Sequence, residues 1–315
     1  MPEFDITLAG EANLDMVFYG LPEALPMERE LLATGLSTLM GGSAAITAHN
    51  LSALGSKTGF IAQTGDDPWT AFCLRDLARV GVDLSQVVAP RPKLGTGITV
   101  FLQHGNLRQA FTHAGAISEL KFADLNLDYL SSSRHFHLSS LFLQRALRAD
   151  ASRLLAAMRQ AGLTTSLDTN DDPSGLWGEP LTDVLRHVDI LLPNAYEACR
   201  IARKDKVEDA AQELAKTVPV VVVKMGDQGA FALHGGRRYA APGLNVSTID
   251  TVGAGDSFNA GFLHFWTQGG GIEECLEFGN ACGAYSTTAE GGICAFQNNL
   301  ALQEFLTRHT RLRTL

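Results

Sequence analysis

The sequence has little that would suit a nucleic-acid or membrane partner. Its 25 Lys and Arg residues are outnumbered by 34 Asp and Glu residues, which leaves a net charge of −9. No basic stretch exceeds a few residues, so we expect no nucleic-acid partner. No run approaches the roughly 20 apolar residues that cross a bilayer, and Met1 to Asp5 lack the pattern of a signal peptide. We therefore expect a cytoplasmic protein with no membrane partner.

Several catalytic signatures are also missing. The five cysteines are odd in number and lack Cys-x-x-Cys spacing, which favours reduced thiols over a zinc site. A Walker P-loop, a His-Glu-x-x-His motif and a Gly-x-Ser-x-Gly elbow are absent. No Gly-x-Gly-x-x-Gly follows the first expected strand, which argues against an NAD-binding Rossmann enzyme.

The remaining pattern is that of an α/β protein. The chain has 315 residues, 45% of them hydrophobic, and 31 glycines. From Ser118 onward, expected strands and helices alternate, which predicts a doubly wound, mainly parallel sheet with right-handed crossovers. Among the expected helices are one near 120–130 and one over 144–161. Residues 16–40 and 95–115 break the alternation and predict short strands, with a hairpin that turns at 104–107.

The most informative stretch runs from Asp250 to Gly261 and reads Asp-Thr-Val-Gly-Ala-Gly-Asp-Ser-Phe-Asn-Ala-Gly. Its glycines permit a sharp turn into a helix whose first N–H groups lack partners, which makes an anion site suited to phosphate. Asp256 falls in the first turn, where an isolated Asp would be a helix cap. Beside an anion site, a carboxylate could instead accept a proton from a hydroxyl that attacks phosphorus.

This stretch resembles the second signature of the PfkB (ribokinase-like) carbohydrate kinase family. The resemblance implies a three-layer α/β sandwich over residues 1–315, a single ribokinase-like domain with a small β lid from about 16–40 and 95–115. It implies an anion hole at Gly253, Ala254 and Gly255, with Asp256 as the catalytic base.

The resemblance also assigns residues to the acceptor sugar. The first strand, 4–10, ends in an Asn-x-Asp pattern, and a double glycine precedes a helix at 43–54. Asp168 and Asn170 follow a later strand, although turn formation explains neighbouring Asp171 and Asp172. His113 ends the hairpin, where a structural or surface role is equally expected. The implied acceptor-binding residues are Asn13, Asp15, Gly42, Asp168, Asn170 and His113.

A second group of residues would hold ATP and its ions. Asn194-x-x-Glu197 resembles the family motif whose Glu orders Mg²⁺ through water, although an acid there could merely offset the helix dipole. The implied nucleotide-binding residues are Asn194, Lys224, Gly226, Gly229 and Asn280. A monovalent cation such as K⁺, which the family often uses, would involve Asp250, Val252 and Gly291.

The chain departs from the family pattern in the first helix. Ser43 stands where ribokinases usually have Lys, and Ile46 stands where the family usually has an Asn that reaches the substrate. We expect an ATP-dependent kinase acting on a hydroxymethyl group of a sugar, and a homodimer formed through the lid. A nucleoside kinase of the same family competes, supported by Ile46 and by the lid aromatics Phe101 and Phe111. A catalytically silent sugar or nucleotide sensor is a further alternative, against which Asp256 argues.

Overall fold

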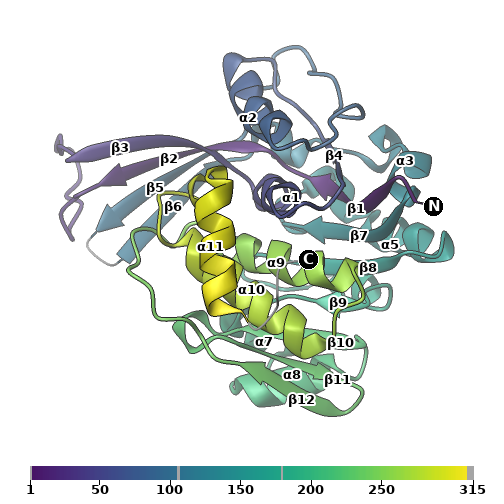
Figure 1. Cartoon of the computed structure of the whole chain (residues 1–315). Coiled ribbons are helices and arrows are strands. Elements are labelled where there is room, and N and C mark those ends of the chain that lie inside the picture. Colours follow the sequence, from purple (N-terminus) through teal and green to yellow (C-terminus); the bar gives the residue numbers. More distant parts are fainter. Residues whose placement is uncertain (1, 105–106, 179, 311–315) are drawn as a thin grey trace.

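An eight-stranded sheet forms the centre of the computed structural model, which describes residues 2–104, 107–178 and 180–310 (Figure 1). Its strand order is β12-β11-β10-β9-β8-β7-β1-β4. The strands are β1 (Phe4–Gly10), β4 (Thr58–Ala62), β7 (Ser133–Ser139), β8 (Thr164–Asp168), β9 (Ile190–Leu191), β10 (Val220–Lys224), β11 (Ala230–His234) and β12 (Arg237–Ala241).

The sheet is parallel from β4 to β10, and only β11 and β12 pair antiparallel. The four valines of β10 are all buried, as expected for a parallel strand covered on both faces. The doubly wound, mainly parallel sheet is therefore confirmed.

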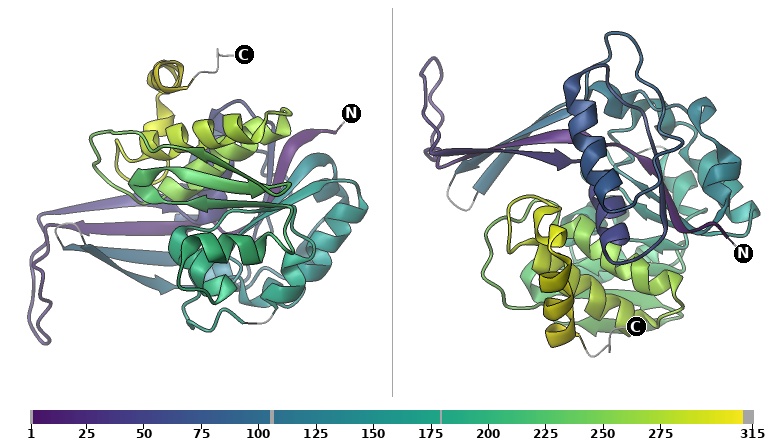
Figure 2. Two further views of the ribbon diagram at one scale, coloured as in Figure 1. Left: turned by 90° about the horizontal axis from the view of Figure 1, so that it is seen from below. Right: turned by 45° about the horizontal axis from the view of Figure 1, so that its top comes forward.

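Helices cover both faces of this sheet and give three layers (Figures 1 and 2). One face packs α1 (Ser43–Ala53), α2 (Pro68–Arg79), α9 (Ala254–Thr267), α10 (Ile272–Ser286) and α11 (Asn299–His309). The other packs α3 (Leu127–Ser131), α4 (Arg145–Arg148), α5 (Ala151–Gln160), α6 (Leu181–Leu185), α7 (Ala195–Ala202) and α8 (Val207–Leu214). Within the described residues, no helix is both long enough and apolar enough to cross a membrane.

A second, four-stranded sheet projects from the main body (Figure 2). It has the order β3-β2-β5-β6 and consists of β2 (Asn13–Tyr19), β3 (Gly35–Gly41), β5 (Ile98–His104) and β6 (Leu107–His113). The segments 16–40 and 95–115 thus form the separate small sheet expected of a lid. The expected turn at 104–107 lies partly outside the described residues.

Two expected helices are wrong in detail. The helix expected over 144–161 is divided into α4 and α5, with Asp150 as the residue before α5. Buried Leu147 and Ala151 lie four residues apart, on either side of this break. Because the apolar spacing of a helix continues across the break, the sequence pattern does not reveal it. Near 120–130 only a short 3₁₀ turn and α3 form.

Candidate active site

The predicted anion hole lies at the start of α9. Gly253 is the residue before the helix and adopts a left-handed φ of 73°. A Cβ atom there would lie 2.4 Å from the Cα of Gly292, so only glycine fits. In the described part of the chain, no acceptor is found for the N–H of Gly255. The helix start therefore presents N–H donors and the positive end of its dipole.

The carboxylate of Asp256 lies where two helices begin. Asp256 is in the first turn of α9 and is 9% exposed. Ser43, the first residue of α1, donates a hydrogen bond from Oγ to Asp256 Oδ1. The first turns of both helices therefore meet at this carboxylate. Ser43 is a contact that sequence reasoning missed, since residues 43 and 256 lie far apart in the chain.

Asn13 and Asp15 begin the lid strand β2 and contact each other. Asn13 Nδ2 donates to Asp15 Oδ1 over 2.8 Å, and both side chains are buried. The double glycine lies against them: a Cβ on Gly41 would meet the Asp15 carboxylate at 2.1 Å, and one on Gly42 would meet Asn13 Oδ1 at 2.8 Å. Gly42 directly precedes α1, so these predicted acceptor residues lie next to the helix that contacts Asp256.

Glu11 is a buried acid that sequence reasoning did not single out. Its Oε1 accepts from Ser140 Oγ over 2.6 Å and from the Ala44 N–H over 3.4 Å. Its Oε2 has no hydrogen-bond partner among the described residues. Burial, above all, raises the pKa of Glu11 to about 7, and the charge of Asp256 adds to this rise. Glu11 therefore lies close enough to Asp256 for the two carboxyl groups to interact electrostatically.

Lys224 and Asp168 form a buried ion pair next to the anion hole. Lys224 Nζ donates to Asp168 Oδ2 over 2.6 Å, and Asn259 Nδ2 donates to the same oxygen over 2.6 Å. A Cβ on Gly255 would lie 3.4 Å from Lys224 Nζ. Burial raises the pKa of Asp168, but the Lys224 charge and the hydrogen bonds outweigh it and leave that pKa lowered. Asn259, three residues after Asp256 on the same helix face, was missed from the sequence.

Asn170 makes hydrogen bonds to both Ser140 and Asp168. It has a left-handed φ of 52°, and its Oδ1 accepts from the Ser140 N–H over 3.0 Å. Its own N–H donates to Asp168 Oδ1 over 3.1 Å. Ser140 thus connects Asn170 to Glu11, and these residues lie at the carboxyl ends of neighbouring strands, where ligands bind in such sheets.

The Asn194–Glu197 motif forms a reciprocal cap of α7. The Asn194 N–H donates to Glu197 Oε2 over 2.8 Å, and the Glu197 N–H donates to Asn194 Oδ1 over 2.9 Å. Burial first, and then the charge of Asp168, raise the pKa of Glu197 to about 7. The carboxyl groups of Glu197 and Asp168 lie close enough to interact electrostatically, and neighbouring carboxylates suit a hard divalent cation such as Mg²⁺.

A cavity of about 610 Å³ opens beside the anion hole, within the size range of ligand sites. It is bounded by the start of α9, by α10 and by the loops at 226–229 and 243–248. The predicted nucleotide residues Lys224, Gly226, Gly229 and Asn280 line it together with Ala254 and Gly255. Asn280 Nδ2 already donates to the carbonyl oxygens of Ala241 and Pro242, at 2.9 and 3.1 Å.

The residues assigned to a monovalent cation also converge. Asp250 Oδ1 accepts from the Val252 N–H over 3.0 Å, and Oδ2 accepts from the Gly291 N–H over 2.9 Å. This carboxylate therefore ties the loop before the anion hole to the turn after α10. The described residues contain no group of three or more His, Cys, Asp or Glu side chains suited to a metal ion.

The strand register bears on one sequence interpretation, that of His113. The strand pairing aligns Asp15, Thr99 and Thr112 in one row and Leu14, Ile98 and His113 in the next. Because neighbouring rows face opposite sides of a sheet, His113 is not brought together with Asp15. Ile46 is 3% exposed and packs in the core.

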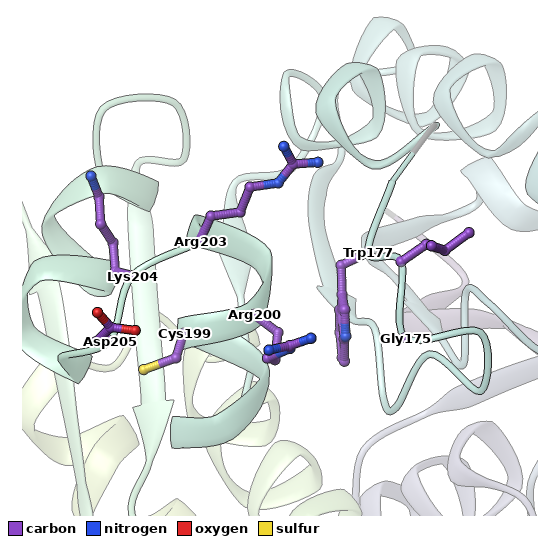
Figure 3. Close-up of a pocket in the computed structure, with 8 residues that line it drawn as sticks. Gly175, Trp177, Cys199, Arg200, Arg203, Lys204 and Asp205 are labelled. Atoms are coloured by element: carbon purple, nitrogen blue, oxygen red, sulfur yellow. The ribbon is translucent and has the colours of Figure 1, made fainter.

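A second pocket, of about 270 Å³, contains none of the predicted site residues (Figure 3). It lies between the loop at 175–177 and the end of α7. In the described ranges, no carboxylate lies within salt-bridge distance of Arg200 or Arg203. Cations at a helix C-terminus offset its dipole, so we interpret these side chains as stabilising α7.

Comparison with known proteins identifies the family. The model of the pfkB family of carbohydrate kinases matches residues 4–298. The chain belongs to this family. It is therefore a phosphotransferase with an alcohol acceptor, a sugar kinase.

Similar proteins are named for several different acceptors, which include sugars, sugar derivatives and a nucleoside. An ATP-dependent ribose-1-phosphate kinase of Halopiger xanaduensis is 30% identical, and the match covers 91% of this chain and 93% of the relative. A 2-dehydro-3-deoxygluconokinase of Bacillus subtilis is 27% identical, covering 85% and 86%. Ribokinase of Thermotoga maritima has a TM-score of 0.81 at 22% identity, covering 96% and 99%. Adenosine kinase of Sinorhizobium meliloti has a TM-score of 0.84 at 20% identity, covering 96% and 99%. The two structures show the shared fold.

Proposed function

We propose that this kinase transfers the γ-phosphoryl group of ATP to a hydroxymethyl group of a sugar, with Asp256 as the base. The observation that carries the proposal is the place of Asp256, a buried carboxylate between the starts of α1 and α9, next to the anion-hole glycines. The acceptor oxygen forms the new bond to phosphorus while its proton passes to Asp256, and the bond to the β-phosphate oxygen breaks to release ADP.

Charge on the transferred phosphoryl group is stabilised from two sides. The N–H groups at the start of α9 point at the transferred group, and the Lys224 ammonium lies next to Gly255. Asp168 and Asn259 fix this ammonium by hydrogen bonds. Glu197 would hold Mg²⁺ through water, and the bound ion neutralises phosphate oxygens.

The acceptor binds between the lid and α1 in this proposal. Asn13 and Asp15 provide hydrogen-bonding groups from the lid, and Gly42 allows close approach to the backbone. Phe101 lies two residues beyond the Asp15 row and therefore on the same face of the lid as Asp15. Phe111 lies on the opposite face and is 57% exposed. Only one of the two lid aromatics that favoured a nucleoside therefore faces the site, which supports a sugar acceptor.

A coupled ADP-release assay tests the acceptor class. Purified protein with Mg-ATP would be given ribose, ribose 1-phosphate, fructose, fructoselysine, 2-dehydro-3-deoxygluconate and adenosine. We expect turnover with a sugar or sugar derivative. Turnover with adenosine alone would contradict the sugar proposal and establish the nucleoside alternative.

We also propose that the lid forms a homodimer through its outer face. Met16, Phe18, Leu36, Val100 and Phe111 lie on one face of the lid because their rows are two residues apart. Leu36 and Phe111 are each 57% exposed, so this face is apolar and incompletely covered. Sedimentation should show a dimer that Leu36→Asp/Phe111→Asp converts to a monomer; a wild-type monomer at micromolar concentration would contradict this proposal.

A monovalent cation behind the anion hole remains a prediction. Its support is the convergence of Asp250, Val252 and Gly291. Turnover in K⁺ should exceed turnover in tetramethylammonium at equal ionic strength, and equal rates would contradict a cation requirement.

The protein is expected to work in the cytoplasm.

A further inference from the structure

We propose that Asn50, which no sequence motif marked, is a positioning residue that holds the anion hole in shape. This inference rests on the proposed role of residues 253–256 in phosphoryl transfer. Asn50 lies in α1 and is completely buried. Its Nδ2 donates to Ser257 Oγ over 2.9 Å and to the Gly292 carbonyl oxygen over 2.9 Å. One amide therefore joins α1, α9 and the turn after α10.

The hydrogen bonds form a consistent relay of donors. Both N–H groups of the Asn50 amide are used as donors, so its Oδ1 must accept, and it lies 2.8 Å from His49 Nδ1. Burial lowers the pKa of His49, which leaves a neutral ring that donates from Nδ1. Ser257 Oγ accepts from Asn50 and donates to the Gly253 carbonyl oxygen over 2.8 Å. Each polar atom in the relay thus has a partner with the correct role.

Fixing the Gly253 carbonyl also fixes the N–H that follows it. A trans peptide group is planar, so the N–H of Ala254 points opposite to the carbonyl of Gly253, and it donates to the Thr251 carbonyl oxygen over 3.3 Å. Two bonds hold that carbonyl, one from Ser257 Oγ and one from the Ser257 N–H at 2.9 Å. The orientation of this peptide sets the direction in which the first turn of α9 presents its donors.

The second Asn50 bond keeps Gly292 against Gly253. These two residues pack so closely that a Cβ on Gly253 would lie 2.4 Å from the Gly292 Cα. Ile46, one helical turn before Asn50, packs on the same pair: its Cδ1 lies 3.3 Å from a Cβ built on Gly253 and 2.7 Å from one built on Gly292. Ile46 therefore supplies the apolar contact behind the anion hole, and Asn50 supplies the hydrogen bonds.

The test compares Asn50→Ala with Leu51→Ala, a neighbour in α1 that is equally buried and has no part in the relay. With the best acceptor from the panel, Asn50→Ala should lower kcat roughly 10- to 100-fold, because a misplacement of about 1 Å can cost that much. The KM for the acceptor should change less than about threefold, since Asn50 does not touch it. Leu51→Ala should lose thermal stability but keep kcat below its melting temperature.

If Asn50→Ala fails to fold, Ser257→Ala removes the same link to Gly253 and should give the same loss of kcat.

A rescue variant separates the amide donors from the volume of the side chain. Ile46→Asn/Asn50→Ala places an amide one turn earlier on the same helix face, within reach of Gly253 and Gly292, and should recover roughly tenfold in kcat. The inference is overturned if Asn50→Ala keeps wild-type kcat, if Leu51→Ala loses kcat equally, or if the double variant recovers nothing. Full turnover in Asp256→Asn would instead refute the proposed base and leave the Asn50 comparison intact.

Discussion

Lys224 and Asp168 form an ion pair next to the predicted anion hole, with side chains only 12% and 2% exposed. Their 2.6 Å contact joins the end of β10 to the end of β8, strands that are separated in the sheet by β9. Because Lys224 Nζ also lies next to Gly255, this pair connects the sheet to the anion hole.

We therefore expect Lys224→Met to reduce both stability and turnover. Removing one partner of a buried ion pair leaves an uncompensated charge, which typically costs about 3–5 kcal/mol in the free energy of unfolding. The double variant Lys224→Met/Asp168→Asn should regain much of that stability but not kcat, since the ammonium next to the phosphoryl group is still missing. Urea unfolding and steady-state kinetics measure the two effects separately. Equal recovery of both would show that Lys224 acts only on stability.

Glu11 makes the stability of the protein depend on pH. Its pKa is raised from 4.5 to about 7 in the folded protein. Between these values the folded protein keeps a proton that the unfolded chain has released, so stability falls as pH rises. We expect Glu11→Gln to exceed wild type in the free energy of unfolding at pH 8, by up to roughly 3 kcal/mol. At pH 5 the difference should largely vanish.

The matched control for this prediction is Glu273→Gln, because Glu273 is an exposed acid in the first turn of α10. Its unfolding free energy should follow wild type at both pH values. If the free energy of unfolding of Glu11→Gln equals that of wild type from pH 5 to pH 8, ionisation of the Glu11 carboxyl does not destabilise the folded protein.

Asp15 should govern the acceptor and not the nucleotide. It contacts Asn13 in the lid and lies against Gly41, away from the cavity that Lys224 and Asn280 line. Asp15→Asn removes a charged acceptor of sugar hydroxyls, and hydrogen bonds to charged groups contribute about 1.5–3 kcal/mol. We expect kcat/KM for the sugar to fall roughly 10- to 100-fold, with the KM for ATP nearly unchanged. A similar rise in the KM for ATP would show that Asp15 also affects nucleotide binding.

The sequence predicted elements and motifs well because these depend on local patterns. The helix start after Gly253 and the alternation of strands and helices appear where they were expected. The division between α4 and α5 was missed because the apolar spacing continues across it.

Contacts between distant segments were beyond the reach of such patterns. Ser43 with Asp256, and Asn50 with Ser257, join helices that are more than 200 residues apart in the chain, and their meeting depends on how α1 crosses α9. His113 shows the same limit in a sheet, because only the strand register reveals that it faces away from Asp15. The resemblance to the family located candidate residues, but the orientation of each side chain depended on tertiary packing.

The most direct test of the account is single-turnover transfer from γ-labelled ATP to the acceptor, comparing wild type with Asp256→Asn. The substitution keeps the shape and the hydrogen bond from Ser43 but removes the proton acceptor. We predict a rate at least roughly 10²- to 10³-fold lower, with ATP binding retained and with Glu273→Gln as fast as wild type. A wild-type rate in Asp256→Asn would contradict the assignment of Asp256 as the base.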